Sequence, residues 1–149
     1  MEKTISERAL EFAINAHANQ TDKAGKPYIQ HVKRVASNLQ DEELRAIAYL
    51  HDVIEDTTFT AKDISDEFGY EIACDVQALS RNKDEAYANF IKRISKRSRA
   101  VKVKMNDLKD NLDLSRLPSV SNLDLERAEK YKMALSFLEL IEEKKSGVV

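Results

Sequence analysis

Apolar residues recur at the spacing of a helix along almost the whole chain, and no segment alternates between apolar and polar residues as a strand would. A loop over residues 21–27 is predicted by its polar residues, one glycine and one proline. Thr60 and Asp63 have the spacing of a capping box at the start of a short helix. Helices are predicted over residues 5–18, 28–39, 41–55, 61–68, 70–80, 84–95, 98–113 and 122–144. The pattern therefore predicts a single all-α domain, a compact bundle of about seven or eight helices spanning residues 1–149.

The last predicted helix, over residues 122–144, carries enough apolar residues to pack against the rest of the domain. These residues are Leu123, Leu125, Ala128, Met133, Leu135, Phe137, Leu138 and Ile141. The same residues are compatible with a homo-oligomer, but the pattern does not determine which apolar side chains stay exposed. We therefore expect a packing helix here and leave the oligomeric state open.

The composition is that of a globular protein with a well-solvated surface: 42% of the 149 residues are hydrophobic and 34% are charged. The net charge of −2 argues against a protein that binds DNA or RNA, because such domains are strongly basic. No apolar run approaches the roughly 20 residues that span a bilayer, so no membrane partner is expected. The single cysteine, Cys74, excludes a disulfide within one chain and favours a cytoplasmic location.

Residues 51–56, with the sequence His-Asp-Val-Ile-Glu-Asp, place one imidazole and three carboxylates in a run that otherwise has the pattern of a buried helix. Burial of so many ionisable groups is costly unless something compensates, and a divalent metal ion is the simplest compensation. On a continuous helix His51 would share a face with Glu55, and Asp52 would share a face with Asp56. We therefore predict one set of metal ligands and, one helical turn later, a pair of carboxylates that orients water and transfers protons.

Two further residues could complete a metal site with His51 and Asp52. His31 follows the predicted loop, and Asp107 lies in a helix of basic and apolar residues. Two imidazoles and two carboxylates form a mixed nitrogen and oxygen site, which suits Mn²⁺, Fe²⁺ or Zn²⁺ better than a metal that prefers thiolates. The remaining histidine, His17, is expected to pack on a helix face near the loop.

The distinctive residues fall into five stretches. They are Ala16-His17-Ala18-Asn19-Gln20, Gly25-Lys26-Pro27-Tyr28-Ile29-Gln30-His31, Leu50-His51-Asp52-Val53-Ile54-Glu55-Asp56-Thr57, Phe68-Gly69 and Val103-Lys104-Met105-Asn106-Asp107-Leu108-Lys109-Asp110-Asn111. In this order they resemble the HD-domain metal-dependent phosphohydrolases. Within that family the chain is similar to the (p)ppGpp 3′-pyrophosphohydrolase domain of RelA/SpoT homologues, especially their small stand-alone versions. The motif-bearing part is expected to cover residues 5–113.

The resemblance implies a hydrolase that releases pyrophosphate from guanosine 3′,5′-bis(diphosphate) (ppGpp), or from a related nucleotide 3′-pyrophosphate, in the stringent response. It implies Mn²⁺ as the cofactor and a small nucleotide as the partner. By the same resemblance the metal ligands are His31, His51, Asp52 and Asp107, the catalytic pair is Glu55 and Asp56, and the substrate-binding residues are Lys23, Lys104 and Asn111.

The chain departs from the family pattern at Asp22, which stands where the family usually has an arginine that lies against the guanine base. A carboxylate cannot stack as a guanidinium does, and it repels phosphate. Base specificity therefore stays open, with two alternatives: hydrolysis of another nucleotide phosphate, and a non-catalytic HD domain that binds a nucleotide. Because the chain ends at residue 149, we expect no synthetase domain of the kind that follows in the long members of the family.

Overall fold

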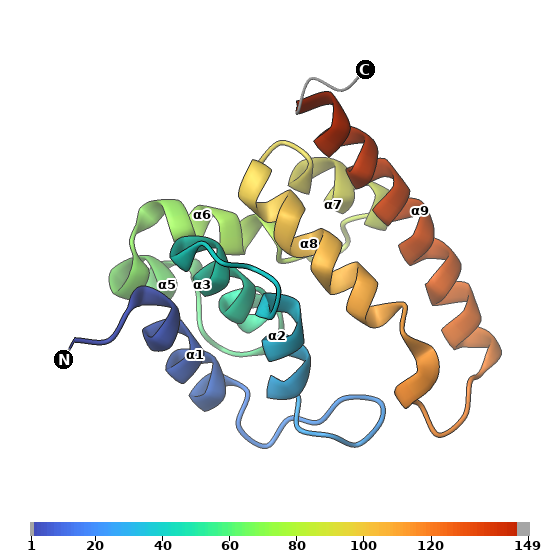
Figure 1. Ribbon diagram of the computed structural model, residues 1–149, viewed down its shortest axis with the longest axis horizontal. Helices are drawn as coiled ribbons and strands as arrows, with labels where there is room; N and C mark the ends of the chain where they lie inside the picture. The colour runs from blue at the N-terminus through green and yellow to red at the C-terminus, as the bar shows by residue number, and fades with distance from the viewer. Residues whose placement is uncertain (1, 146–149) are drawn as a thin grey trace.

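The computed structural model describes residues 2–145, and the regular structure within them is helical (Figure 1). The helices are α1 (Ile5–Ala16), α2 (Ile29–Ala36), α3 (Glu42–Leu50), α4 (Val53–Asp56), α5 (Ala61–Phe68), α6 (Tyr70–Ala78), α7 (Tyr87–Ile94), α8 (Ser98–Asn111) and α9 (Asn122–Lys145), with a 3₁₀ turn, η1, at Leu114–Arg116. Within these residues eight α-helices exceed one turn, while α4 has only four residues. The predicted all-α bundle of seven or eight helices is confirmed.

Helix α3 lies at the centre of the molecule. Its residues 46–50 are all buried, because α1, α2, α6 and α8 pack around it. A helix that is buried on every side in this way depends on the rest of the domain for its stability. The apolar run that precedes the 51–56 segment therefore forms the part of the core that supports the candidate site.

Helix α8 connects α2, α3 and α6 with α7 and α9, because it contacts all five of these helices (Figure 1). Helix α9 lies along α8, and its buried residues are Ala128, Ala134 and Leu138. Other apolar side chains of α9 stay on the surface: Met133 is 75% exposed and Leu140 is 56% exposed. None of the described helices, α9 included, is long and apolar enough to cross a membrane.

The helix predicted over residues 41–55 is not continuous, because α3 ends before His51 and α4 begins after Asp52. The His51 N–H bonds to the Ala48 carbonyl at 3.4 Å, and Asp52 leaves helical geometry with φ −104° and ψ 1°. In a regular helix the side chains of consecutive residues point about 100° apart around the axis. In this turn the side chains of His51 and Asp52 instead approach one point. The prediction of one unbroken helix is therefore wrong, and the break allows two neighbouring residues to serve one site.

The short helix α5 begins and ends as predicted. Thr60 and Asp63 form a capping box, in which each side chain accepts the backbone N–H of the other residue. Gly69 ends the helix at φ 96°, a left-handed value that glycine adopts without steric cost. The predicted loop over residues 21–27 is also observed, and a single β-bridge joins its two ends.

Candidate functional site

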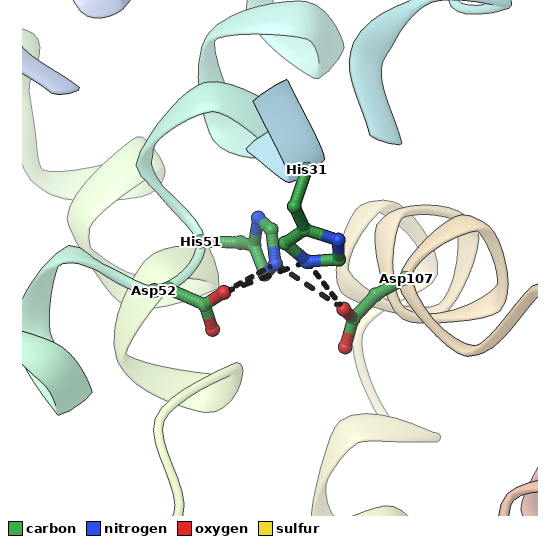
Figure 2. A group of neighbouring side chains, drawn as sticks. All are labelled: His31, His51, Asp52 and Asp107. Carbon is green, nitrogen blue, oxygen red and sulfur yellow. Dashed lines mark ion pairs between the residues drawn. The ribbon is translucent and has the colours of Figure 1, made fainter. Parts of the chain in front are cut away.

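Four side chains that the sequence predicts as metal ligands meet at one point (Figure 2). His31 comes from α2, His51 and Asp52 from the turn after α3, and Asp107 from α8. One donor atom of each residue lies within 4.8 Å of the corresponding atom of every other. Together they form the His–Asp cluster, in which the two imidazoles and Asp107 are buried and Asp52 is partly accessible.

The His–Asp cluster brings two imidazole nitrogens close to two carboxylate oxygens. Nε2 of His51 lies 2.9 Å from Oδ2 of Asp52 and 3.5 Å from Oδ1 of Asp107. Nε2 of His31 lies 3.0 Å from the same Asp107 oxygen and 3.7 Å from the same Asp52 oxygen. Bonds from nitrogen and oxygen ligands to zinc are about 2.0–2.2 Å long, which puts neighbouring ligand atoms roughly 3–3.5 Å apart. The donor atoms are therefore spaced as they would be around one divalent ion.

His51 has the hydrogen bonding expected of a metal ligand. Its Nδ1 lies 2.6 Å from the Ala48 carbonyl, to which only a protonated ring nitrogen can donate. Nε2 is buried and faces the carboxylates of Asp52 and Asp107, and in the neutral ring it carries the lone pair that would bind a metal ion. Burial disfavours the charged ring, but Asp52 and Asp107 raise the pKa of His51 well above its ordinary value, so a bound cation would take the place of the Nε2 proton. The His–Asp cluster therefore fits a divalent metal ion.

A further carboxylate, from Asp110 on α8, holds His31 from the opposite side of the ring. Oδ2 of Asp110 lies 2.7 Å from Nδ1 of His31, while Nε2 faces the cluster. Arg34 donates to both oxygens of Asp110 at 2.8 and 3.1 Å, and Arg116 lies 3.2 Å from Oδ1. Carboxylates that orient a metal-binding histidine in this way also strengthen it as a ligand. The sequence prediction omitted Asp110, although its position three residues after Asp107 puts both on one helix face.

The carboxylates of the cluster are themselves held by hydrogen bonds. The Tyr28 hydroxyl donates to Oδ2 of Asp52. Lys104 donates to Oδ2 of Asp107 at 2.9 Å, and Asn111 donates to Oδ1 at 3.0 Å. Lys104 and Asn111, both predicted as substrate contacts, thus lie directly against a predicted metal ligand. The role of Tyr28 was not predicted, since it depends on how the loop meets the turn after α3.

The charges of the cluster stabilise one another. Burial disfavours a charged imidazole, but hydrogen bonds to Asp107 and Asp110 raise the pKa of His31 to about 9. Burial also opposes the ionisation of Asp52, yet the charge of His51 lowers the pKa of that carboxyl to about 2. A dication competes with the proton for Nε2 of His31, so metal binding and proton release are linked.

Glu55 and Asp56 extend from α4, within one turn of the cluster, and both are exposed. Partial burial of the carboxyl group, with repulsion by Asp52 and Glu55, raises the pKa of Asp56 to about 6. Glu55 accepts a hydrogen bond from the backbone N–H of Arg81 at 2.7 Å. A carboxylate with a pKa close to neutrality is suited to accept and release protons at physiological pH. The Glu55–Asp56 pair can therefore accept and donate the protons of a hydrolytic reaction.

A cavity of about 300 Å³ opens beside the His–Asp cluster. Its lining includes His31, Asp110 and Asn111 next to the cluster, together with Arg127 and Tyr131 of α9. This volume is at the lower end of the range of small-molecule sites. The cavity therefore offers a guanidinium and an aromatic ring to a ligand that reaches the cluster.

The loop before α2 also lines this cavity, through Asp22 and Lys23. Oδ1 of Asp22 accepts the N–H groups of Ala24 and Lys26, each at 2.9 Å, so this carboxylate shapes the loop. Lys23, a predicted substrate contact, lies 3.3 Å from Asp124 of α9. The loop and α9 are thus linked at the edge of the cavity.

A family model and several known proteins are similar to this chain. The family model described as HD domain matches residues 9–107. A guanosine-3′,5′-bis(diphosphate) 3′-pyrophosphohydrolase from Aquifex aeolicus is 35% identical over 118 residues, which cover 71% of this chain and 17% of that protein. A protein of the same name from Haemophilus influenzae is 37% identical over 111 residues, which cover 66% of this chain and 16% of that protein. The chain therefore spans about a sixth of the length of these relatives.

A solved structure titled "A metazoan ortholog of SpoT hydrolyzes ppGpp and plays a role in starvation responses" has the same fold. It matches 100% of this chain and 99% of its own, with a TM-score of 0.76 and 22% sequence identity. The family model covers more than half of the chain. The resemblance that the motifs suggested is thereby confirmed, and the chain belongs to the HD domain family.

Proposed function

We propose that this protein is a divalent-metal-dependent hydrolase that releases pyrophosphate from ppGpp or from a related nucleotide 3′-pyrophosphate. The observation that carries the proposal is the His–Asp cluster, which has a cavity at His31 and the Glu55–Asp56 pair one helical turn after Asp52. The similarity to relatives named as 3′-pyrophosphohydrolases supports the choice of substrate.

The proposed metal is Mn²⁺, held by the four residues of the His–Asp cluster. A set of two imidazoles and two carboxylates suits a metal that accepts both nitrogen and oxygen ligands. When bound, the ion supplies a Lewis acid that lowers the pKa of water and polarises a phosphoryl oxygen. The direction of His51 Nε2 toward the cluster carboxylates and the orientation of His31 by Asp110 support a divalent ion at this site.

Glu55 and Asp56 supply the proton chemistry of the proposed reaction. Asp56, with a pKa of about 6, is mostly ionised at neutral pH and can accept a proton from water. Glu55, held by the Arg81 N–H, can orient the same water. The water oxygen forms a bond to the phosphorus attached to O3′ of the ribose, and the bond from that phosphorus to O3′ breaks. A proton passes to O3′, which leaves a 3′-hydroxyl group and pyrophosphate.

The cavity is the proposed binding site for the rest of the nucleotide. Lys23 and Asn111 line it, and Arg127 adds a guanidinium that has no ion pair among the described residues. These cationic and amide groups can offset and orient phosphate charge. Tyr131 offers a ring face to the base. Lys104, bonded to Asp107, is proposed to contact the phosphate nearest the cluster.

A second candidate is hydrolysis of another nucleotide phosphate, and Asp22 is the observation that favours it. Asp22 lines the cavity, at a position where the family resemblance implies an arginine against guanine. A non-catalytic nucleotide-binding domain is less favoured, because the His–Asp cluster and the Glu55–Asp56 pair are complete. A screen of phosphorylated nucleotides with Mn²⁺ separates these candidates.

We also propose a single domain over residues 1–149 that acts in the cytoplasm, in the removal of a stress nucleotide. The composition and the family resemblance support this setting. A small nucleotide is the proposed partner, and the net charge of −2 gives no support to a DNA or RNA partner.

The test is pyrophosphate release from ppGpp by the purified, Mn²⁺-loaded protein. We expect release by the wild-type protein and a loss of at least about 100-fold in the Glu55→Ala/Asp56→Ala double variant. The double variant is the control, since its His–Asp cluster is unchanged. Absence of release from a folded, metal-bound wild-type protein would refute the proposed substrate and favour another nucleotide phosphate.

A further inference from the structure

Helix α4 carries both carboxylates of the proposed chemistry, yet it is a single turn. An isolated turn of helix is unstable, because too few hydrogen bonds offset the entropy of fixing its backbone. The last carbonyls of any helix also lack partners within that helix. The position of α4 must therefore depend on contacts from other parts of the chain.

One such contact comes from Gln20, in the segment that follows α1. Its Nε2 donates to the backbone carbonyl of Asp56 at 3.1 Å, which gives a partner to one of the unpaired carbonyls of α4. Its Oε1 lies 3.0 Å from Nδ1 of His17. An amide oxygen only accepts, so Nδ1 of His17 is the donor, and the Gln20 amino group is turned toward α4. His17 is 3% exposed, so packing around its ring holds it beside Gln20.

The backbone of Gln20 reaches the other half of the site. Its carbonyl accepts the Tyr28 N–H at 2.9 Å, and the Tyr28 hydroxyl donates to Asp52. The His17 and Tyr28 rings are also in contact, with centroids 5.0 Å apart. The side chain of Gln20 therefore binds α4. Its backbone binds Tyr28, which in turn bonds to the proposed metal ligand Asp52.

We propose that Gln20, oriented by His17, is a positioning residue that holds the Glu55–Asp56 pair in register with the His–Asp cluster. This inference rests on the proposed function, because it gives α4 the role of presenting the carboxylates to the reacting water. Gln20 acts on the rate of the hydrolytic step, and it leaves metal binding and substrate binding to the cluster and the cavity. His17 serves the orientation of Gln20, which explains why a buried histidine stands beside the site without joining the cluster.

The test compares Gln20→Met with Gln20→Glu. Methionine keeps the length of the side chain and removes both hydrogen bonds, whereas glutamate keeps the acceptor for His17 and loses the donor to Asp56. Gln40→Glu is the matched control, because Gln40 is exposed in the loop before α3. We expect kcat for the hydrolysed nucleotide to fall about 10- to 100-fold in both Gln20 variants, as for a misplacement near 1 Å. KM and the Kd for Mn²⁺ should stay within about twofold of the wild type.

Amide hydrogen exchange provides a readout that does not need activity. The N–H groups of Asp56 and Thr57 bond to Asp52 and Val53 within α4, and they should exchange faster in both Gln20 variants. Unchanged kcat with unchanged exchange would overturn the inference. So would a Mn²⁺ Kd that weakens in parallel with kcat, since Gln20 would then act through the cluster. If the wild type hydrolyses no nucleotide, the proposed function fails, and the exchange rates alone decide whether Gln20 holds α4.

Discussion

Replacing Asp110 by asparagine tests whether the His–Asp cluster is a metal site whose ligands are oriented from outside. The Asp110 carboxylate is shared by His31, Arg34 and Arg116 at distances of 2.7 to 3.2 Å. Asparagine has nearly the same volume, but it has one acceptor oxygen and no charge. It cannot satisfy three donors, so the orientation of the His31 ring is weakened.

Two effects of opposite sign determine how much Asp110→Asn changes the affinity for Mn²⁺. Loss of a partner that orients a metal ligand costs about 10- to 100-fold in metal affinity, or roughly 1.4–2.8 kcal/mol. Against this, Asp110 helps raise the pKa of His31 to about 9, so a proton opposes metal binding in the wild type at neutral pH. Asp110→Asn lowers the pKa of His31 and so removes part of the competition between the proton and the metal ion. The loss in affinity should therefore be about tenfold near pH 7 and larger near pH 8.5.

Calorimetric titration of Mn²⁺ into both proteins at the two pH values measures this change. Asp113→Asn is the matched control, because Asp113 bonds to Ser115 and Arg116 at the end of α8 and does not contact His31. The control should bind Mn²⁺ as the wild type does, and thermal unfolding should show that all three proteins are folded. Equal affinities for wild type and Asp110→Asn at both pH values would refute the reasoning.

Three further predictions concern catalysis, the cavity and the core. The pKa of Asp56 is raised to about 6, and its ionised form is the proposed base, so kcat/KM should fall about tenfold per pH unit below that value; a flat profile from pH 7 to 5 would contradict this role. Arg127→Gln should raise KM for a nucleotide with several phosphates about tenfold with little change in kcat; a KM that stays at the wild-type value in steady-state assays would remove Arg127 from the binding site. Leu138→Ala should cost about 2–5 kcal/mol in urea unfolding, because the side chain is fully buried, whereas Leu140→Ala, at a position that is 56% exposed, should cost about 0.5 kcal/mol or less.

Helical periodicity predicted the elements well because each helix buries one apolar face against its neighbours. It did not predict the turn at His51 and Asp52, because the apolar residues on both sides keep their helical spacing through the break. The turn brings both side chains to one centre together with His31 and Asp107, which are distant in sequence. The start of α7 at Tyr87 rather than near residue 84 has a local cause: Asp84 has φ 66°, outside helical geometry.

The proposed ligand set could be predicted from residue types and the family resemblance, and the structure brings those four residues together. The groups around them could not be inferred in the same way. Gln20 and Asp56 are 36 residues apart, and His31 and Asp110 are 79 apart, so their contacts follow from tertiary packing. The residue types in the motifs indicated the chemistry, while the packing of α1, α4 and α8 determines how each group is oriented.

The division of the site between helices has a consequence for how such a protein can change during evolution. The His–Asp cluster and the carboxylate pair lie within residues 31–107, inside the region that matches the family model. Arg127 and Tyr131, which line the cavity, belong to α9 and lie beyond that region. Under the proposed function, mutations on α9 would therefore alter which molecule is accepted while the proposed ligands stay unchanged. A lineage would then acquire a new preference through changes on one surface helix, with its proposed chemistry intact.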